Sequence, residues 1–242
     1  MNFRSIIIVV MTFLAIVLLG IQIKEDDQIA SILRAILVIL IFVLYASKKE
    51  KIQWCFLVFL GFYALAEIFN STAYFIPVYP EIDPFYYIIN GLYIAAYGTI
   101  VAKLVRRMNF KTIIKKFPVH LIILLLLDFY FVYMFNDILR DMVYFDEQIM
   151  ESLYNGVIMI MLCLSFLNYL ERDNKSSLFL FAGASLVVLS EVFQMTYFYV
   201  KENYIINFLY VILMILAFLC IYRHSRLDYN ENVDRELEGQ IN

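Results

Sequence analysis

Runs of roughly 18–25 apolar residues recur along almost the whole chain, and each run is long enough to cross a bilayer as a helix. Hydrophobic residues make up 63% of the chain and charged residues 17%, whereas only about half of the residues in a soluble domain are apolar. We therefore predict an all-α, polytopic membrane helix bundle. Its eight transmembrane helices are expected at about 5–22, 29–46, 52–76, 85–106, 117–136, 149–170, 176–200 and 204–223.

Basic residues occupy alternate connections of this predicted bundle. They precede the first span and follow the second, fourth, sixth and eighth spans, and they are Arg4, Lys48, Lys49, Lys51, Arg106, Arg107, Lys111, Lys115, Lys116, Arg172, Lys175, Arg223, His224 and Arg226. The other loops are acidic or nearly neutral. Because Lys and Arg are retained on the cytoplasmic side of a membrane, both termini are predicted to be cytoplasmic. We expect a multi-pass protein of a bacterial inner membrane.

The predicted spans leave little sequence for a soluble domain. Residues 1–224 form a single expected transmembrane domain, and the polar, acidic segment 225–242 is predicted to be a disordered cytoplasmic tail. The formal net charge is −3. No basic domain is present to bind nucleic acid, so we do not expect a nucleic-acid partner.

One seven-residue string appears twice, as YIINGLY beginning at Tyr87 and as YIINFLY beginning at Tyr204. Each copy follows an apolar segment that carries a single glutamate, Glu67 in the first case and Glu191 in the second, 124 positions apart. The chain therefore resembles two copies of one unit. Since a charge inside an apolar segment is costly, both glutamates are candidate functional residues.

Two such units divide the transmembrane domain at about 1–108 and 109–224. Four helices per unit is an even number, so the two repeats are expected to be parallel in the membrane. Glu67 and Glu191 each lie 16 residues beyond a matched lysine at the inner surface. At about 1.5 Å per residue, this places them roughly 24 Å along their spans, in the outer half of the bilayer. Three other polar residues, Arg34, Asn90 and Asn207, are expected at a comparable level. Together these residues predict a cavity that opens toward the outer face.

Local spacing places an amide beside each glutamate. Asn70 and Gln194 follow Glu67 and Glu191 by three residues, and therefore share a helix face with them. Two buried carboxyls that share one proton supply a general acid and a general base together. The alternative is that each glutamate, in its protonated form, ties helices together through a hydrogen bond worth roughly 0.6–2 kcal/mol.

Asp128 is a third intramembrane carboxylate, near the middle of the predicted fifth span, with no clear counterpart in the first span. It either pairs with Arg34 or belongs to the site. The three cysteines are far apart in the sequence and both histidines lie near the cytoplasmic edges, so we predict neither a disulfide framework nor a metal site. No cofactor-binding motif is present, and no cofactor is expected.

These features are similar to those of the YhhN family of integral membrane proteins, whose characterised members are lysoplasmalogenases. The resemblance rests on eight spans, on Arg34 at the start of the second span, and on acidic residues late in the third span (Glu67) and the seventh (Ser190-Glu191). It covers most of the chain, from about the second span to the eighth. The family typically has Asp where this chain has the two glutamates, and often has His in the fourth span, where this chain has Asn90.

The resemblance implies that the protein hydrolyses the vinyl ether bond of a lysophospholipid-like membrane lipid by carboxyl acid/base chemistry, without a metal or other cofactor. It implies that Glu67 and Glu191 are the acid/base pair and that Arg34 meets the lipid phosphate. The amides expected to orient the pair are Asn70, Asn90, Gln194 and Asn207.

Two other functions stay open. One is a proton-coupled small-molecule transporter, which would also place paired acids at a repeat interface. The other is a non-catalytic lipid-binding membrane protein of the same fold.

Overall fold

A computed structural model describes residues 3–22, 24, 26–47, 52–76, 83–140 and 142–241, with side chains as far as residue 229. Three of the basic loop residues named above, Lys48, Lys49 and Lys51, lie outside the described residues. Within the described part of the chain, every regular element is a helix and no strand is present. This confirms the predicted all-α class.

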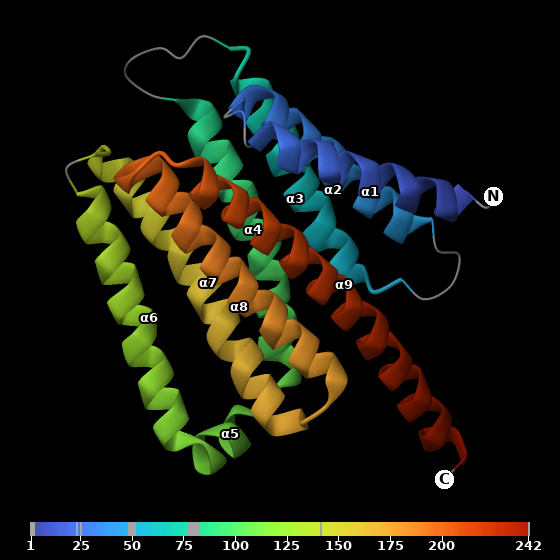
Figure 1. Ribbon diagram of the computed structural model, residues 1–242. Helices are drawn as coiled ribbons and strands as arrows, with labels where there is room; N and C mark the ends of the chain where they lie inside the picture. The colour runs from blue at the N-terminus through green and yellow to red at the C-terminus, as the bar shows by residue number, and fades with distance from the viewer. Residues whose placement is uncertain are drawn as a thin grey trace.

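Eight of the described helices are long and apolar enough to cross a membrane. They are α1 (Phe3–Gln22), α2 (Asp27–Ala46), α3 (Trp54–Ala73), α4 (Pro84–Arg107), α6 (Pro118–Leu139), α7 (Phe145–Arg172), α8 (Lys175–Met195) and α9 (Tyr204–Ile241). A short helix, α5 (Phe110–Lys116), connects α4 to α6, and a π-helical turn, η1 (Thr196–Val200), extends α8. The predicted bundle of eight spans is therefore confirmed, and the architecture is that of an integral, multi-pass membrane protein (Figure 1).

Short polar residues mark where several helices begin and end. Asp26, Asp83 and Asn174 precede α2, α4 and α8, and the side chain of each accepts a hydrogen bond from a backbone N–H of the first turn. Such caps satisfy donors that have no partner inside the helix. α7 ends at Arg172, the next residue, Asp173, has a left-handed backbone (φ 45°), and Asn174 then caps α8. The turn between these two long helices is therefore short.

The helices pack in chain order within two groups. α1 packs on α2, α2 on α3 and α3 on α4, while α6 packs on α7, α7 on α8 and α8 on α9. The groups meet where α4 packs on α7 and where α1 packs on α9. Consecutive helices are usually neighbours in space, so this order is expected of a helical bundle with or without a repeat. The internal repeat itself stays a prediction.

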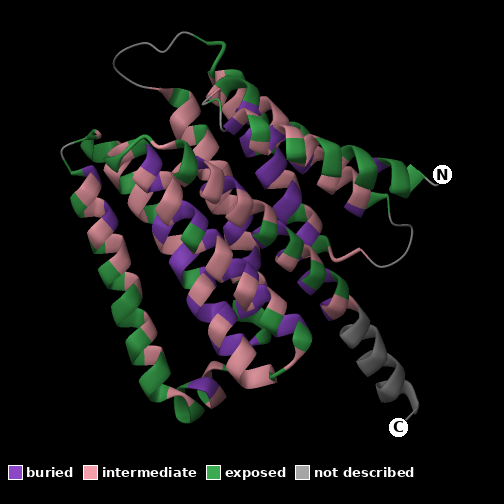
Figure 2. Cartoon of the chain, in the orientation of Figure 1, coloured by how far each residue is buried: buried purple, intermediate pink, exposed green. Residues whose placement is uncertain are grey.

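Burial is greatest on α7 and α8 and least on α6, as Figure 2 shows. α6 contacts α7 and α5, and much of its surface is apolar and exposed, for example at Leu126 and Phe129. In a bilayer, an apolar face of this kind is solvated by acyl chains rather than by water. The polar groups that matter for function therefore have to be sought between α3, α4, α7, α8 and α9.

α8 and α9 approach each other closely at Gly183 of α8. A Cβ atom at this position would lie 2.8 Å from Cγ1 of Ile221 and 3.3 Å from the backbone oxygen of Ala217, both on α9. Small residues allow membrane helices to come this close. The contact fixes α9 against α8, and so fixes the position of Tyr210 relative to Glu191.

The segment predicted to be a disordered tail from residue 225 differs from the structure. α9 continues without a break to Ile241, and both Ser225 and Asp228 are buried. Asp228 contacts Lys103 and Arg107 of α4. The polar composition of this segment predicted exposure to water, but the ion pairs of Asp228 with Lys103 and Arg107 hold its first turn against α4. The helix therefore extends past the predicted boundary at 225, and the predicted domain division stays a prediction.

Candidate functional site

The polar residues singled out in the sequence lie toward one end of the bundle, where the α3–α4, α6–α7 and α8–α9 loops are found (upper part of Figure 1). Glu67 and Glu191 lie near the ends of α3 and α8, whereas Asn90 and Tyr210 lie near the starts of α4 and α9. The four residues therefore lie toward the same end of the bundle, in line with the alternating direction of successive helices.

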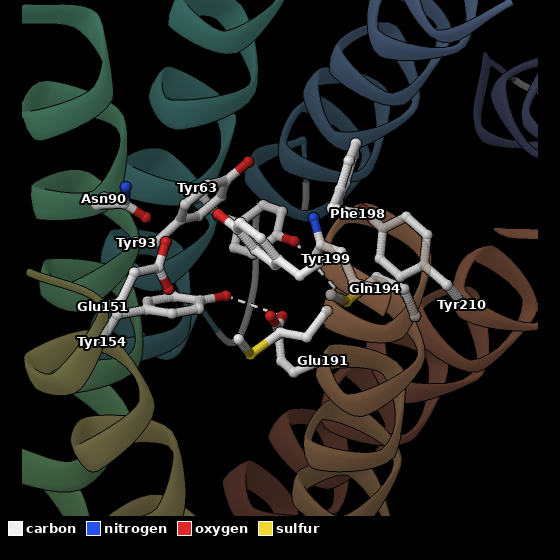
Figure 3. A pocket seen from close by; sticks show the side chains of 12 residues that line it. Tyr63, Asn90, Tyr93, Glu151, Tyr154, Glu191, Gln194, Phe198, Tyr199 and Tyr210 are labelled. Atoms are coloured by element: carbon white, nitrogen blue, oxygen red, sulfur yellow. Dashed lines mark hydrogen bonds between the residues drawn. The ribbon is translucent and has the colours of Figure 1, made fainter. Parts of the chain in front are cut away.

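A cavity of about 280 Å³ lies between α3, α4, α7, α8, η1 and α9 (Figure 3). Its size is near the lower end of the range for small-molecule sites. Two carboxyls, two amides and several tyrosine hydroxyls belong to its wall. The lining residues are Tyr63, Asn90, Tyr93, Glu151, Tyr154, Glu191, Gln194, Met195, Phe198, Tyr199, Tyr210 and Met214.

Glu191 is buried and points into the cavity (Figure 3). The hydroxyl of Tyr154, on α7, donates a hydrogen bond to Oε1 of Glu191 over 2.8 Å. The neighbouring Ser190 donates to the backbone oxygen of Tyr210 over 3.1 Å, which anchors this turn of α8 to α9. The Glu191 carboxyl is thus held between three helices, with Oε1 engaged and Oε2 not hydrogen-bonded to any described residue.

Glu67 is also buried but does not belong to the cavity wall. The hydroxyl of Tyr93 donates to Oε1 of Glu67 over 2.9 Å, and Nε of Arg34 lies 3.9 Å from Oε2. Nη1 of Arg34 donates to the hydroxyl of Tyr210 over 3.0 Å. Tyr93 and Tyr210 both line the cavity, so the Arg34–Glu67 pair is connected to it through two tyrosines.

The Arg34–Glu67 pair retains unused hydrogen-bonding capacity. Nε of Arg34 and Oε2 of Glu67 are buried, and neither has a hydrogen-bond partner among the described residues. Buried polar atoms are normally paired, and exceptions occur where a water, an ion or a ligand is bound. These two atoms, 3.9 Å from each other, could therefore both hydrogen-bond to a further polar group.

Glu151, which the sequence analysis did not single out, is the second carboxyl of the cavity wall. It comes from the start of α7, and the hydroxyl of Tyr86 donates to its Oε1 over 2.9 Å. Tyr154 and Asn155 follow Glu151 by three and four residues, so the three side chains share one face of α7. That polar stripe was the signal from which Glu151 and Tyr154 could have been found.

Tyrosine rings form the wall between the two glutamates. The ring centroids of Tyr63 and Tyr93 are 5.0 Å apart, and those of Tyr93 and Tyr154 are 6.1 Å apart. Tyr93 and Tyr210 are the last residues of the two copies of the repeated string. One of them contacts Glu67 and the other contacts Arg34, so the string contributes directly to the site.

The remaining predicted site residues are distributed unevenly. Asn90 and Gln194 line the cavity, and the side chain of Asn90 donates to the backbone oxygen of Tyr86 over 3.1 Å. Asn70 and Asn207 do not line it. Asp128 accepts a hydrogen bond from Sγ of Cys163 over 3.0 Å, between α6 and α7, so the structure places it neither beside Arg34 nor in the cavity wall.

Among the described residues, no group of three or more His, Cys, Asp and Glu side chains is arranged to hold a metal ion. Comparison of the chain with protein-family models, with curated proteins and with solved structures found no match. The chemistry of the cavity wall is therefore the main guide to function.

Proposed function

We propose that this cavity is the active site of an intramembrane lipid hydrolase that cleaves the vinyl ether bond of a lysophospholipid-like lipid, as in the YhhN family, with Glu191 as the proton donor. The observation that carries the proposal is the position of Glu191. It is a buried carboxyl whose Oε1 is fixed by Tyr154 and whose side chain faces a cavity between the membrane-spanning helices.

Hydrolysis of a vinyl ether begins with proton transfer to carbon. The protonated Glu191 carboxyl gives its proton to the outer vinyl carbon, and the electron pair of the double bond forms the new C–H bond. The product is an oxocarbenium ion, which water attacks. The resulting hemiacetal loses its alcohol, which leaves as the glycerophospho-base, and an aldehyde remains. A positioned acid accelerates such a step by roughly 10²–10⁴-fold.

Glu151 is the partner that this chemistry requires. As a carboxylate on the same cavity wall, it stabilises the developing cation and accepts a proton from the attacking water. Tyr86 holds one of its oxygens, as Tyr154 holds one oxygen of Glu191. Two carboxyls in different surroundings are the usual way to keep one protonated and the other ionised.

Glu67 and Arg34 act through the tyrosines in this scheme. Glu67 fixes the hydroxyl of Tyr93, and Arg34 fixes that of Tyr210. Both are positioning residues rather than groups that touch the reacting bond. Of the predicted Glu67–Glu191 pair, only Glu191 would then contact the substrate, whereas Glu67 would act on it indirectly through Tyr93.

The charge distribution supports the orientation that we propose for the protein. α4 and α5 both end in basic residues at the end of the bundle opposite the cavity. Under the positive-inside rule this end is cytoplasmic, with both termini inside and the cavity toward the outer leaflet. In a bacterial inner membrane, the substrate would then come from that leaflet.

The test is aldehyde release by the purified protein from a lysoplasmalogen. We expect release by the wild type and loss of at least about a hundredfold in Glu191→Gln, which keeps an acceptor for Tyr154. The matched control is Glu202→Gln, because Glu202 is an exposed glutamate in the loop after η1. Undiminished release in Glu191→Gln, with the control also active, would rule out the assigned proton donor.

One observation favours a second function, proton-coupled transport. The π-helical turn η1 contributes Phe198 and Tyr199 to the cavity wall, and π-helical segments recur at functional sites and irregular points of helices. A helix end that rearranges beside Glu191 would suit a transporter. Substrate flux in liposomes without aldehyde formation, lost in Glu191→Gln, would identify that function. Saturable lipid binding with neither flux nor product would identify a non-catalytic lipid-binding protein.

A further inference from the structure

The end of the bundle opposite the cavity holds a second polar cluster, built around Asp228 of α9. Asp228 is 1% exposed. Nζ of Lys103 and Nη1 of Arg107, both on α4, lie 2.8 Å and 2.5 Å from its Oδ2. Nη1 of Arg172, at the end of α7, lies 3.8 Å from Oδ1, and Nε2 of Gln53 donates to Oδ2 over 2.7 Å. One buried carboxylate therefore faces three cations from two other helices.

Lys103 has no hydrogen-bonding capacity left. Besides Asp228, its ammonium contacts Oε1 of Gln53 at 3.0 Å and Nε2 of His224 at 3.2 Å. Because an ammonium only donates, Nε2 of His224 accepts. Nδ1 of the same ring lies 2.9 Å from the backbone oxygen of Ser176, so it carries the proton. His224 is thus neutral, and the charge of Lys103 balances that of Asp228.

Arg107 and Arg172 remain as surplus positive charge. No other described carboxylate lies within ion-pair distance of either guanidinium. The two side chains are 34% and 21% exposed, so they reach the surface of this end of the bundle. Each guanidinium has five N–H donors, and a single nitrogen of each contacts Asp228. Most of their donors are therefore available to a further acceptor.

Arg107 and Arg172 contact different oxygens of the same carboxylate, so the two positive charges are close together and a second anion beside them would lower their mutual repulsion. Their planar forks match the tetrahedral oxygens of a phosphate, which can accept paired hydrogen bonds from both. We propose that Arg107 and Arg172 form a binding site for a phosphate group, supplied either by the headgroup of an anionic lipid or by free phosphate. The site is separate from the cavity, because neither arginine lines it, and it joins α4 to α7 at the predicted cytoplasmic end.

The first arm of the test uses inorganic phosphate. Calorimetric titration of the full-length protein in detergent should give saturable binding. Arg107→Gln with Arg172→Gln should weaken it by at least about tenfold, since each charge-assisted contact contributes about that factor or more. The matched control is Lys115→Gln with Lys116→Gln, which removes two positive charges from α5 at the same end. The control should bind within about twofold of wild type, as expected for charges that make no direct contact.

The second arm uses lipid. The protein is placed in nanodiscs of phosphatidylcholine with and without phosphatidic acid, whose headgroup is a phosphomonoester, and thermal unfolding is measured. Stabilisation by phosphatidic acid that requires both arginines identifies a lipid headgroup as the source. Binding in the first arm alone identifies free phosphate. Saturable binding in neither arm, or equal loss in the arginine and lysine variants, overturns the proposal.

A folding control keeps the result interpretable. Because Arg107 makes the shorter contact with Asp228, the double variant loses part of the packing between α4 and α9. Arg172→Gln alone removes only the 3.8 Å contact and should fold. It should still weaken phosphate binding by about tenfold. Wild-type affinity in a folded Arg172→Gln variant would contradict the assignment.

Discussion

The contact between Tyr154 and Glu191 joins α7 to α8 through one hydrogen bond of 2.8 Å. It occupies Oε1 and leaves Oε2 to carry the proton that the proposed reaction transfers. The ring of Tyr154 is itself fixed by Tyr93 and Tyr97, with centroids 6.1 Å and 6.2 Å away. A hydroxyl held this way limits the carboxyl to one orientation, which is what positioned acid catalysis needs.

Replacing Tyr154 with Phe removes this donor and keeps the ring. We expect kcat to fall by about tenfold or more, while stability changes by only about 1 kcal/mol, the usual net value of one hydrogen bond. Tyr199→Phe is the control, because Tyr199 lines the same cavity but does not contact Glu191. Aldehyde-release kinetics and thermal unfolding of both variants check this, and equal kcat values in the two would contradict it.

The ion pair of Arg34 and Glu67 gives a stability prediction. Glu67→Gln leaves a mostly buried guanidinium without its counter-charge, and breaking a buried pair from one side typically costs about 3–5 kcal/mol. The double change Arg34→Met with Glu67→Leu removes both charges, so it should be closer to wild type than the single variant. Thermal unfolding in detergent compares them. A double variant less stable than the single one would show that the pair is not the reason for the loss.

The sequence predicts the depth of the site residues along their helices but not the side chains that they contact. The rise of about 1.5 Å per residue along a helix fixes depth, so Glu67, Glu191 and Asn90 could be assigned to one level. Which side chains meet at that level depends on how each helix is rotated and tilted. That rotation put Tyr93 between Glu67 and the cavity, and it turned Glu151 inward.

Among the elements, the eight spans could be predicted from the apolar runs, because a bilayer imposes a minimum helix length. The part of α9 beyond the predicted membrane boundary could not be predicted in this way. Its composition is polar, and only the contacts of Asp228 with Lys103 and Arg107 on α4 show why the first of these turns is buried. A contact between residues this far apart in the sequence cannot be predicted from a hydropathy pattern.

The close packing of α8 on α9 predicts that Gly183→Ala is destabilising. The added methyl would meet Ile221 and a backbone oxygen of α9, and overpacking of this kind typically costs about 1–3 kcal/mol. Gly98→Ala on α4 is the matched control, since nothing lies within 4 Å of its added Cβ. Thermal unfolding should show a loss for Gly183→Ala only. An equal response of both variants would contradict the assigned packing.

At the scale of the whole molecule, the two ends of the bundle differ in chemistry. One end holds carboxyls and tyrosines around a cavity, and the other holds arginines and lysines around Asp228. This asymmetry matches the charge bias that orients membrane proteins. The proposed reaction and the proposed phosphate site therefore lie at opposite ends of the bundle.

The asymmetry predicts the accessibility of single cysteines. In a variant with Cys55, Cys163 and Cys220 replaced by Ala, Lys201→Cys should react with a membrane-impermeant maleimide added to intact cells. Lys115→Cys should react only after the membrane is opened. Both positions are exposed. The reverse pattern would place the cavity on the cytoplasmic side.

The central claim, that Glu191 delivers a proton to a vinyl carbon in this cavity, is tested most directly by isotope incorporation. Hydrolysis of a lysoplasmalogen in D₂O, with the aldehyde reduced at once to prevent exchange, should place one deuterium on the carbon next to the former carbonyl. Labelled product should form at least about a hundredfold more slowly in Glu191→Gln, while Glu202→Gln should behave as wild type. Product without deuterium, or labelled product from folded Glu191→Gln at the wild-type rate, would contradict the account.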